Sequence, residues 1–299
     1  MNRIAAPVTC VIPTHNRPEF LENALNSVAD QTIWPAELIV VDDARCPDTR
    51  SLTERAGVGC FRGISVKYVD RTQFSSSGPG ASASRNLGIR MASEAYLAFL
   101  DDDDVWHPAF LEETLRIFHE RDCQFVVAWT DLWDGSHTQP GHRIRGGLAA
   151  NDALGVNPGL TGSNFVVQSA LARRIGGFDE QLYVANDKDF LVRLLDSGAD
   201  YGVVRRPLVK QRVHSAGQLT GRTQRRVDGL RAFEAKYSSR LNWRNRRDIS
   251  HAISSVERVI AVTRARRARA LVVQCLTYSL PGLAAAFGRR LRPQNLRYR

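Results

Sequence analysis

The sequence lacks the cysteine pattern of a zinc site or of a disulfide-bonded domain. Its cysteines are odd in number, lie far apart and form no Cys-x-x-Cys pair; they are Cys10, Cys46, Cys60, Cys123 and Cys275. Scattered cysteines of this kind are typical of proteins in a reducing compartment. We therefore expect neither a structural zinc ion nor a disulfide framework.

Long apolar runs are also missing. Residues 1–11 have no long apolar core before the polar His15 and Asn16, which favours a first strand over a signal peptide. The uncharged run 270–287 contains several polar residues and a central Pro281-Gly282. A spanning helix needs about 20 strongly apolar residues, so the sequence predicts no transmembrane segment.

Acidic residues are scarce in the last quarter of the chain. Residues 222–299 hold 19 Lys and Arg against 4 Asp and Glu, whereas residues 1–221 hold 22 and 27. The net charge of +10 therefore arises in the tail, and the body is mildly acidic. The 299 residues suffice for one large α/β domain and an appendage. We predict a large α/β domain over residues 1–221 and a basic α-helical extension over residues 222–299.

Three strand-like apolar runs end in polar side chains. The first two are separated by a helical stripe, and strand, helix, strand in about forty residues predicts a parallel α/β sheet. Ligands of such sheets bind beyond the carboxyl ends of the strands. We therefore expect the polar groups to meet at one rim. The runs and their polar ends are residues 8–12 with Thr14, residues 37–41 with Asp42 and Asp43, and residues 95–100 with residues 101–104.

Residues 101–104 are four consecutive aspartates. Their carboxylates repel one another, so each gains from a nearby cation. If strand alternation continues through them, Asp101 and Asp103 face one side, and Asp102 and Asp104 the other. Asp-x-Asp then presents two hard oxygen ligands of the kind that Mg²⁺ and Mn²⁺ prefer. The alternative is an acidic loop that caps the helix beginning near Pro108.

Other polar features of the chain are less specific. Asp187 stands at a helix entrance, where helix capping and catalysis are both open interpretations. His214 follows the last predicted strand and is either a metal ligand or a surface histidine. Residues 78–83 spell G-x-G-x-x-A, but they follow a Ser-rich loop and not the first strand, so a dinucleotide site is not expected. The Gly-rich residues 135–157 are typical of a loop that orders over a substrate.

Six motifs in order carry a resemblance to a known family. Over about residues 7–219 the sequence resembles family 2 glycosyltransferases of the GT-A fold. Each motif alone is weak, but their shared order and spacing are specific. The motifs are residues 11–17 (VIPTHNR), 39–43 (IVVDD), 84–88 (SRNLG), 100–104 (LDDDD), 176–180 (GGFDE) and 186–190 (NDKDF).

The resemblance implies a role for each matching residue. Thr14 and Asp43 match residues that contact the nucleotide base, and Arg85 matches one that lies near the donor. Asp187 matches the general base, although this chain has Asn186-Asp187 where the family commonly has Glu-Asp. The predicted donor-binding residues are Thr14, Asp43, Arg85 and Asp102, and the predicted metal ligands are Asp101, Asp103 and His214.

The resemblance also implies a fold and an activity. The fold is a Rossmann-like, mostly parallel nucleotide-binding sheet with helices on both faces. The activity is transfer of a sugar, with inversion, from a nucleotide-diphosphate donor such as a UDP-sugar to an acceptor hydroxyl. Mn²⁺ or Mg²⁺ stabilises the diphosphate leaving group, and the acceptor is a carbohydrate, a lipid-linked molecule or a small molecule.

Two other classes of protein stay open. A sugar-phosphate nucleotidyltransferase also needs a nucleotide-binding sheet and a metal, but its Gly-rich loop after the first strand is absent here. A non-enzymatic nucleic-acid binder would explain the basic tail but not the acidic rim, which repels phosphates in the absence of metal. We therefore expect no nucleic acid as a partner.

The tail combines a basic cluster with an apolar run. Residues 264–269 contain four arginines and precede the uncharged run 270–287. A basic patch beside an apolar helix is typical of a segment that lies on an anionic membrane surface. We therefore predict a cytoplasmic protein that contacts the inner face of the cell membrane peripherally. In the alternative, the tail helices pack on the catalytic domain or on a second subunit in a homodimer.

Overall fold

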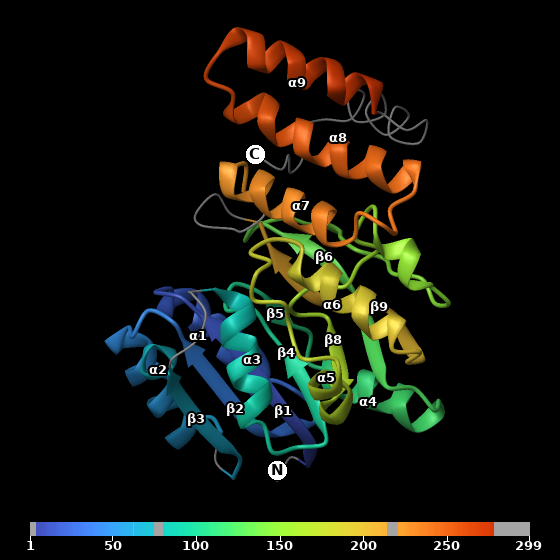
Figure 1. Cartoon of the computed structure of the whole chain (residues 1–299). Helices are drawn as coiled ribbons and strands as arrows, with labels where there is room; N and C mark the ends of the chain where they lie inside the picture. The colour runs from blue at the N-terminus through green and yellow to red at the C-terminus, as the bar shows by residue number, and fades with distance from the viewer. Residues whose placement is uncertain (1–3, 62, 75–79, 214–220, 278–299) are drawn as a thin grey trace. The chain divides into compact units, whose positions relative to one another are not determined.

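The computed structural model describes residues 4–61, 63–74, 80–213 and 221–277 (Figure 1). Strands and helices alternate through the first half, as the hydrophobic pattern predicts. The strands are β1 (Ala5–Thr14), β2 (Trp34–Asp42), β3 (Ser65–Asp70), β4 (Tyr96–Phe99), β5 (Val105–Trp106), β6 (Phe125–Trp133), β7 (Thr138–Pro140), β8 (Phe165–Gln168) and β9 (Tyr201–Arg212). The helices are α1 (Pro18–Ala29), α2 (Pro47–Val58), α3 (Ala81–Met91), α4 (Phe110–Glu120), α5 (Ser169–Arg174), α6 (Asn186–Asp196), α7 (Gln224–Lys236), α8 (Trp243–Ile260) and α9 (Arg264–Leu276).

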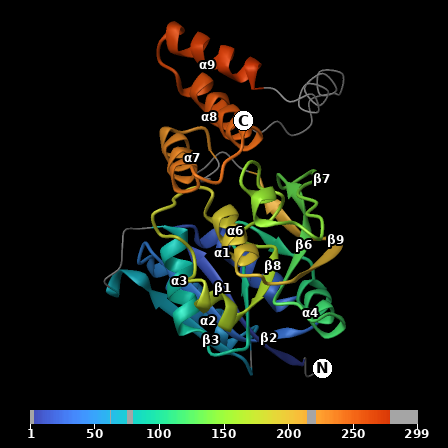
Figure 2. The same cartoon turned by 45° about the vertical axis from the view of Figure 1, so that its right-hand side comes forward.

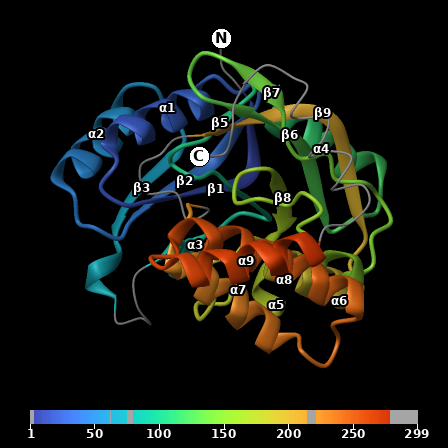
Figure 3. The same cartoon turned by 90° about the horizontal axis from the view of Figure 1, so that it is seen from above.

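The N-terminal half of the sheet is parallel. β1 pairs in parallel with both β2 and β4, and β2 pairs in parallel with β3. Because the register sets Thr14 opposite Asp42 and Val11 opposite Phe99, the carboxyl ends of β1, β2 and β4 lie at one edge. Helices α1 and α2 lie on one face of this half and α3 on the other (Figure 3). The expected rim of polar strand ends is therefore present.

The second half of the sheet is mixed. The strand order is β3-β2-β1-β4-β8-β6-β9-β5, with β7 paired to β6. β8 enters antiparallel between β4 and β6, while β6 and β9 are parallel (Figure 2). The prediction of an α/β sheet with helices on both faces is confirmed. Parallel pairing is continuous from β3 to β4 and occurs again between β6 and β9; β8 interrupts it because it runs opposite to its two neighbours.

Close packing of α3 on β1 depends on one glycine. A β-carbon at Gly88 would lie 2.3 Å from Cγ1 of Val11, so only glycine lets the helix approach the strand this closely. Val11 is fully buried. Since α3 carries Arg85 one turn earlier, this contact fixes the distance of that arginine from the sheet.

The chain divides into two compact units. The first comprises residues 1–150, 158–181 and 186–212, and the second comprises residues 151–157, 182–185 and 213–299. In the second unit α8 packs against α7 and α9 (Figure 1). The predicted boundary between residues 221 and 222 falls after the first unit ends. In the described part of the chain, no helix combines the length and the apolar character that crossing a membrane requires.

The predicted substrate loop at residues 135–157 is anchored to the fold. It contains β7, and the side chains of Ile144 and Leu148 are buried. The indole Nε1 of Trp129 donates a hydrogen bond to the carbonyl oxygen of Ile144 at 2.9 Å. These contacts hold part of the loop against β6.

Candidate active site

The four aspartates form a turn directly after β4. The amide of Asp104 donates to the carbonyl oxygen of Asp101 at 3.1 Å. Burial nevertheless alternates, with Asp102 and Asp104 buried and with Asp101 and Asp103 partly exposed. The strand itself ends at Phe99, before the position that the sequence suggested. A turn, and not a continued strand, therefore produces the expected two-sided arrangement.

Asp104 holds the turn to the segment before β8 and to the end of β9. The Ser163 hydroxyl donates to its Oδ2 at 2.6 Å, and the amide of Arg212 donates to its Oδ1 at 3.0 Å. The same hydroxyl accepts from the amide of Asp101 at 3.0 Å. Burial raises the pKa of Asp104 well above the ordinary value, and nearby Asp103 raises it further. Asp104 therefore organises the site from inside the fold.

Asp102 joins the turn to the loop after β1. The Thr14 hydroxyl donates to Oδ2 of Asp102 at 2.8 Å, and Nη2 of Arg17 lies 3.1 Å from Oδ1. Burial raises the pKa of Asp102 to about 7, against the lowering effect of Arg17. Asp102 thus fixes Thr14 at the rim, and its predicted contact with the donor stays a prediction.

Asp103 is the more accessible carboxylate on the Arg17 side of the turn. Nη1 of Arg17 donates to Oδ2 of Asp103 at 3.1 Å, and the Asp103 side chain is 14% exposed. Nε of Arg212 donates to its carbonyl oxygen at 3.2 Å. The Arg212 guanidinium lies 4.3 Å from the centre of the Trp133 ring, which fixes it at the end of β9.

Arg85 connects the aspartate turn to Asp187. Its side chain is only 3% exposed, and its Nη2 donates to Oδ1 of Asp101. Its Nη1 lies 3.6 Å from Oδ1 of Asp187, and the guanidinium sits 5.1 Å from the centre of the Phe178 ring. One buried cation therefore stands between the Asp-x-Asp motif and the predicted general base.

The Asp187 carboxylate contacts groups outside its own helix. It lies in the first turn of α6, accepts a hydrogen bond from the amide of Gly162 and faces Arg85. Burial raises its pKa to about 6, Arg85 lowers it, and the negative charge of Asp101 raises it. Within the described ranges, Oδ1 of Asp187 and both Nε and Nη1 of Arg85 make no hydrogen bond. The 3.6 Å contact between Nη1 and Oδ1 is therefore an ion pair without a hydrogen bond, and the hydrogen-bonding capacity of these buried atoms is not fully used.

Asn86 and Asn186 link α3 to the segments around this cluster. Asn86 binds the backbone of Phe178, and Asn186 binds Ser82. The Asn86 amide donates to the carbonyl oxygen of Phe178 at 2.8 Å and accepts from the Phe178 amide at 2.7 Å. Asn186 donates to the Ser82 hydroxyl at 3.1 Å. Where the family commonly has glutamate, Asn186 therefore supports α3 through a neutral contact.

Gly162 permits the Arg85–Asp101 pair. A β-carbon at this position would lie 2.2 Å from Nη2 of Arg85 and 2.4 Å from Oδ2 of Asp101. We expect Gly162→Ala to separate the pair and to lower kcat/KM on the order of 10²-fold, the usual cost of misplacing catalytic groups by about 1 Å. Gly146→Ala is the matched control, because its β-carbon would meet no atom within 4 Å. Full activity in Gly162→Ala would exclude this role of the pair.

The two aspartates after β2 have different surroundings. Asp42 is fully buried and accepts from the amides of Ala44 and Cys46 and from the Tyr68 hydroxyl. Asp43 lies at the rim, where it contacts His15 and accepts from the amide of Gly80 at 3.2 Å. Asp42 therefore shapes the turn that follows β2. Asp43 is the carboxylate that lies beside Thr14 at the end of β1.

The donor set fits a hard divalent cation. Asp101 and Asp103 offer partly exposed carboxylates, 29% and 14% exposed, and such ions use one or two carboxylates together with phosphate oxygens and water. No group of three His, Cys, Asp or Glu side chains able to hold a metal occurs in the part of the chain that the structure describes. The predicted ligand His214 lies outside the described residues.

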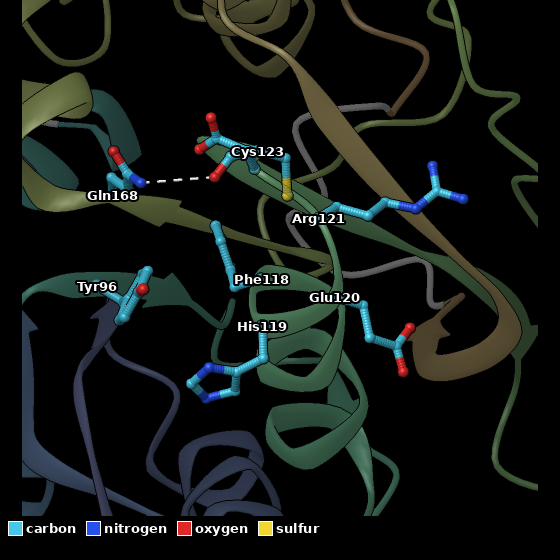
Figure 4. Close-up of a pocket in the computed structure, with 8 residues that line it drawn as sticks. Tyr96, Phe118, His119, Glu120, Arg121, Cys123 and Gln168 are labelled. Atoms are coloured by element: carbon cyan, nitrogen blue, oxygen red, sulfur yellow. Dashed lines mark hydrogen bonds between the residues drawn. The ribbon is translucent and has the colours of Figure 1, made fainter.

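A surface pocket lies at the opposite edge of the sheet. It has a volume of about 390 Å³ and is lined by Tyr96, Phe118, Cys123 and Gln168 among others (Figure 4). Tyr96 begins β4, whereas the aspartate turn follows the end of that strand. The pocket is therefore separate from the rim that carries the candidate site.

Sequence reasoning missed three residues of the site. Arg17 was part of a matching motif but received no role, while Gly162 and Ser163 stand in a Thr-Gly-Ser-Asn stretch before β8. That stretch contains small and polar residues just before a buried strand, which is a usable signal for a close approach. Its partners Arg85, Asp101 and Asp104 lie about sixty or more residues away, so spacing alone could not identify them.

Comparison with protein-family models decides the class of this protein. The model described as glycosyl transferase family 2 matches residues 9–176, more than half of the chain. The chain belongs to this family. A second model, glycosyl transferase family group 2, matches residues 96–287. The protein is therefore a glycosyltransferase, and the predicted enzyme class is confirmed.

Curated relatives of this family 2 member are also glycosyltransferases. TuaG of Bacillus subtilis, whose name places it in teichuronic acid biosynthesis, is 33% identical over 149 residues, which cover 49% of this chain and 56% of TuaG. An uncharacterised glycosyltransferase of Rickettsia typhi is 25% identical over 251 residues, which cover 79% of this chain and 72% of that protein. The match to TuaG thus spans little more than half of that protein.

Solved structures share the fold. TarS of S. aureus, residues 1–349 with UDP-GlcNAc, superposes with a TM-score of 0.61 at 14% identity, covering 94% of this chain and 92% of the other. The mannosyltransferase PcManGT of Pyrobaculum calidifontis, in complex with GDP-Man and Mn²⁺, gives a TM-score of 0.60 at 20% identity, with coverage of 97% and 83%. The predicted GT-A fold is confirmed.

Proposed function

We propose that this glycosyltransferase moves a sugar from a UDP-sugar to an acceptor hydroxyl with inversion, using Asp187 as the general base. The observation that carries the proposal is the Arg85 guanidinium held between Asp101 and Asp187. It sets a base carboxylate beside the Asp-x-Asp motif at the carboxyl edge of the sheet. In an open α/β sheet this is the edge at which nucleotides bind.

Asp187 has the properties that a general base needs. An acceptor hydroxyl is a poor nucleophile at neutral pH, so a positioned carboxylate must accept its proton during the attack. With a pKa of about 6, Asp187 is ionised at neutral pH and is still a stronger base than an ordinary aspartate. Arg85 keeps it ionised, and the amide of Gly162 orients it.

Asp101 and Asp103 are the residues that would hold a divalent cation, which stabilises negative charge on the leaving diphosphate. The complex of PcManGT with GDP-Man and Mn²⁺ supports a metal of this kind. The complexes of TarS with UDP-GlcNAc and with UDP support a uridine nucleotide. Thr14 and Asp43 stand together at the rim, because the amide of Asp43 donates to the carbonyl oxygen of Thr14 at 3.1 Å. We assign this pair to the nucleobase.

The proposal is tested by following UDP release. The purified chain is incubated with a panel of nucleotide sugars, with and without Mn²⁺, and with and without mono- and oligosaccharide or lipid-linked acceptors. We expect release to require the metal, and an added acceptor to raise it well above the slow hydrolysis by water. Pyrophosphate formation from a sugar phosphate and a nucleoside triphosphate would instead identify a nucleotidyltransferase.

Replacement of Asp43 is expected to weaken recognition of the nucleobase. Asp43→Ala removes the carboxylate that contacts His15 and the amide of Gly80. The Michaelis constant for the donor and the dissociation constant for free UDP should rise in parallel, by about tenfold, the range for a charged hydrogen bond. Titration calorimetry with UDP measures the second constant, and Asp30→Ala, an exposed aspartate after α1, is the control. Lost turnover with unchanged UDP affinity would contradict the assignment.

We also propose that the second unit contacts anionic membrane through α9. Its helix begins with four arginines within residues 264–269 and continues with exposed Leu271, Val272 and Leu276, which are 48%, 57% and 78% exposed. Basic side chains beside exposed apolar ones favour an anionic lipid surface. This contact would bring a lipid-linked acceptor to a cytoplasmic enzyme. Packing against a second subunit in a homodimer is the alternative.

Flotation with vesicles tests the membrane contact. Binding to vesicles containing phosphatidylglycerol is expected at low salt and should decrease at high salt, because each basic side chain adds about 1 kcal/mol near such a surface. A full chain with the four arginines replaced by Gln should no longer float. Equal flotation of this variant, or a salt-independent dimer with no flotation, would remove the membrane role.

A further inference from the structure

Arg17 precedes α1 and contacts two adjacent carboxylates of the aspartate turn. Its two terminal nitrogens reach adjacent carboxylates, with Nη2 3.1 Å from Asp102 and Nη1 3.1 Å from Asp103. Its backbone is fixed at the start of α1, where its carbonyl oxygen accepts from the amide of Leu21 at 3.1 Å. Its side chain is 31% exposed. The guanidinium can therefore change partners by rotating side-chain bonds, while its backbone stays in place.

The other two aspartates of the turn are balanced differently. Asp101 is paired with Arg85, a side chain that is 3% exposed and lies over the ring of Phe178. Asp104 is buried and is held by the neutral donors of Ser163 and the Arg212 amide. Of the two arginines whose guanidinium groups pair with carboxylates of the turn, Arg17 is thus the more accessible, and it pairs with Asp103, one of the two carboxylates that the Asp-x-Asp motif offers to a metal.

We propose that Arg17 is an internal counter-cation, which a divalent metal displaces from Asp103 and which then contacts the donor diphosphate. The inference rests on the proposed function, because it requires that Asp103 binds a metal. In the free protein Arg17 offsets the repulsion between Asp102 and Asp103. In the donor complex it keeps its contact with Asp102, and its second nitrogen turns to a phosphate oxygen.

The exchange follows from the geometry of Asp103. Metal–oxygen bonds of Mg²⁺ and Mn²⁺ are about 2.1 Å long, so a metal on Oδ2 of Asp103 would lie within about 5 Å of Nη1 of Arg17. Two like charges so close, on a partly buried carboxylate, repel each other strongly. A diphosphate removes the conflict, because guanidinium groups bind phosphate oxygens with favourable geometry.

The exchange makes metal and nucleotide binding cooperative. Without nucleotide, a metal must displace Arg17 from Asp103 with no new partner available, so metal affinity should be low. With UDP present, Arg17 gains a phosphate contact and the metal gains phosphate ligands. Because coupling between two ligands is reciprocal, Arg17 also makes UDP affinity more dependent on metal.

Mn²⁺ binding, followed by the electron paramagnetic resonance signal of free Mn²⁺, tests the inference. The wild-type chain should bind Mn²⁺ at least about tenfold more tightly in saturating UDP than alone. Arg17→Gln should bind Mn²⁺ alone at least about tenfold more tightly than the wild type, and its ratio between the two conditions should fall. Arg17→Lys keeps the charge and should keep the low affinity. Arg50→Gln, which removes an exposed partner of Glu54, is the control for net charge.

Each outcome has a definite meaning. Equal Mn²⁺ affinity of Arg17→Gln and the wild type without UDP would overturn the counter-cation while leaving the metal site intact. Equal affinity of the wild type with and without UDP would overturn it without reference to any variant. A wild-type chain that binds no Mn²⁺ even with UDP would overturn both the counter-cation and the proposed metal function.

Discussion

Asp187→Asn is expected to lower turnover by about 10²–10⁴-fold, the range for removal of an acid–base group, with donor binding unchanged. Asparagine can still accept from the amide of Gly162, but it cannot take a proton from the acceptor hydroxyl. Single-turnover rates and UDP-sugar titrations measure the two quantities. The matched control is Asp196→Asn, at the exposed end of the same helix.

The pH dependence of the wild type should report the same carboxylate. Because the base acts when deprotonated and its pKa is raised to about 6, kcat/KM should be half-maximal near pH 6 and should level off about one pH unit above it. Below pH 6 it should fall by about tenfold per pH unit as Asp187 takes up a proton. Residual activity of Asp187→Asn should lack this limb. A variant that unfolds readily but keeps its turnover would show that Asp187 serves the helix and not the reaction.

Asp103→Asn is expected to lower turnover by at least about 10³-fold. This is near the upper end of the range of rate losses seen when one group that stabilises transition-state charge is removed. The amide keeps a hydrogen-bond acceptor for Arg17 but loses the negative charge that a cation needs. Donor affinity should lose its dependence on metal. Titration of UDP with and without Mn²⁺ separates this loss from the metal-independent part of binding.

The control for Asp103 is chosen at the opposite edge of the sheet. Asp122→Asn changes an exposed carboxylate beside the pocket of Figure 4 and should leave turnover unchanged. Thermal unfolding of both variants should match the wild type, since Asp103 is not buried in the core. Normal turnover in Asp103→Asn would show that the reaction does not depend on a metal held by Asp103.

Much of the fold could be predicted because its elements have local signals. The run before Asp42 and the run before Asp101 are apolar over a full strand, and both became central strands. The order of strands could not be predicted, because β8 is placed by pairing with residues about 70 and 40 positions away. The end of β4 at Phe99 was missed because a turn of alternating burial resembles a strand in sequence.

The site was predictable where a strand ends in a polar or charged residue. Thr14, Asp43 and the aspartate turn were found in this way, and the structure brings them to one rim. The link between Asp101 and Asp187 could not be predicted, because it runs through Arg85. A sequence does not show which carboxylates a buried arginine will contact. The same holds for Arg17, whose two partners lie 85 and 86 residues further along.

We infer a single displacement in which Asp187 and the Asp101–Asp103 pair act on opposite sides of the anomeric carbon. Proton NMR of UDP-sugar hydrolysis, with water as the acceptor, tests it most directly. At high enzyme concentration and before mutarotation, an α-linked UDP-sugar should release the β-anomer, and Asp187→Asn should slow this release. Initial formation of the α-anomer would contradict the account, because retention requires a mechanism other than one in-line displacement.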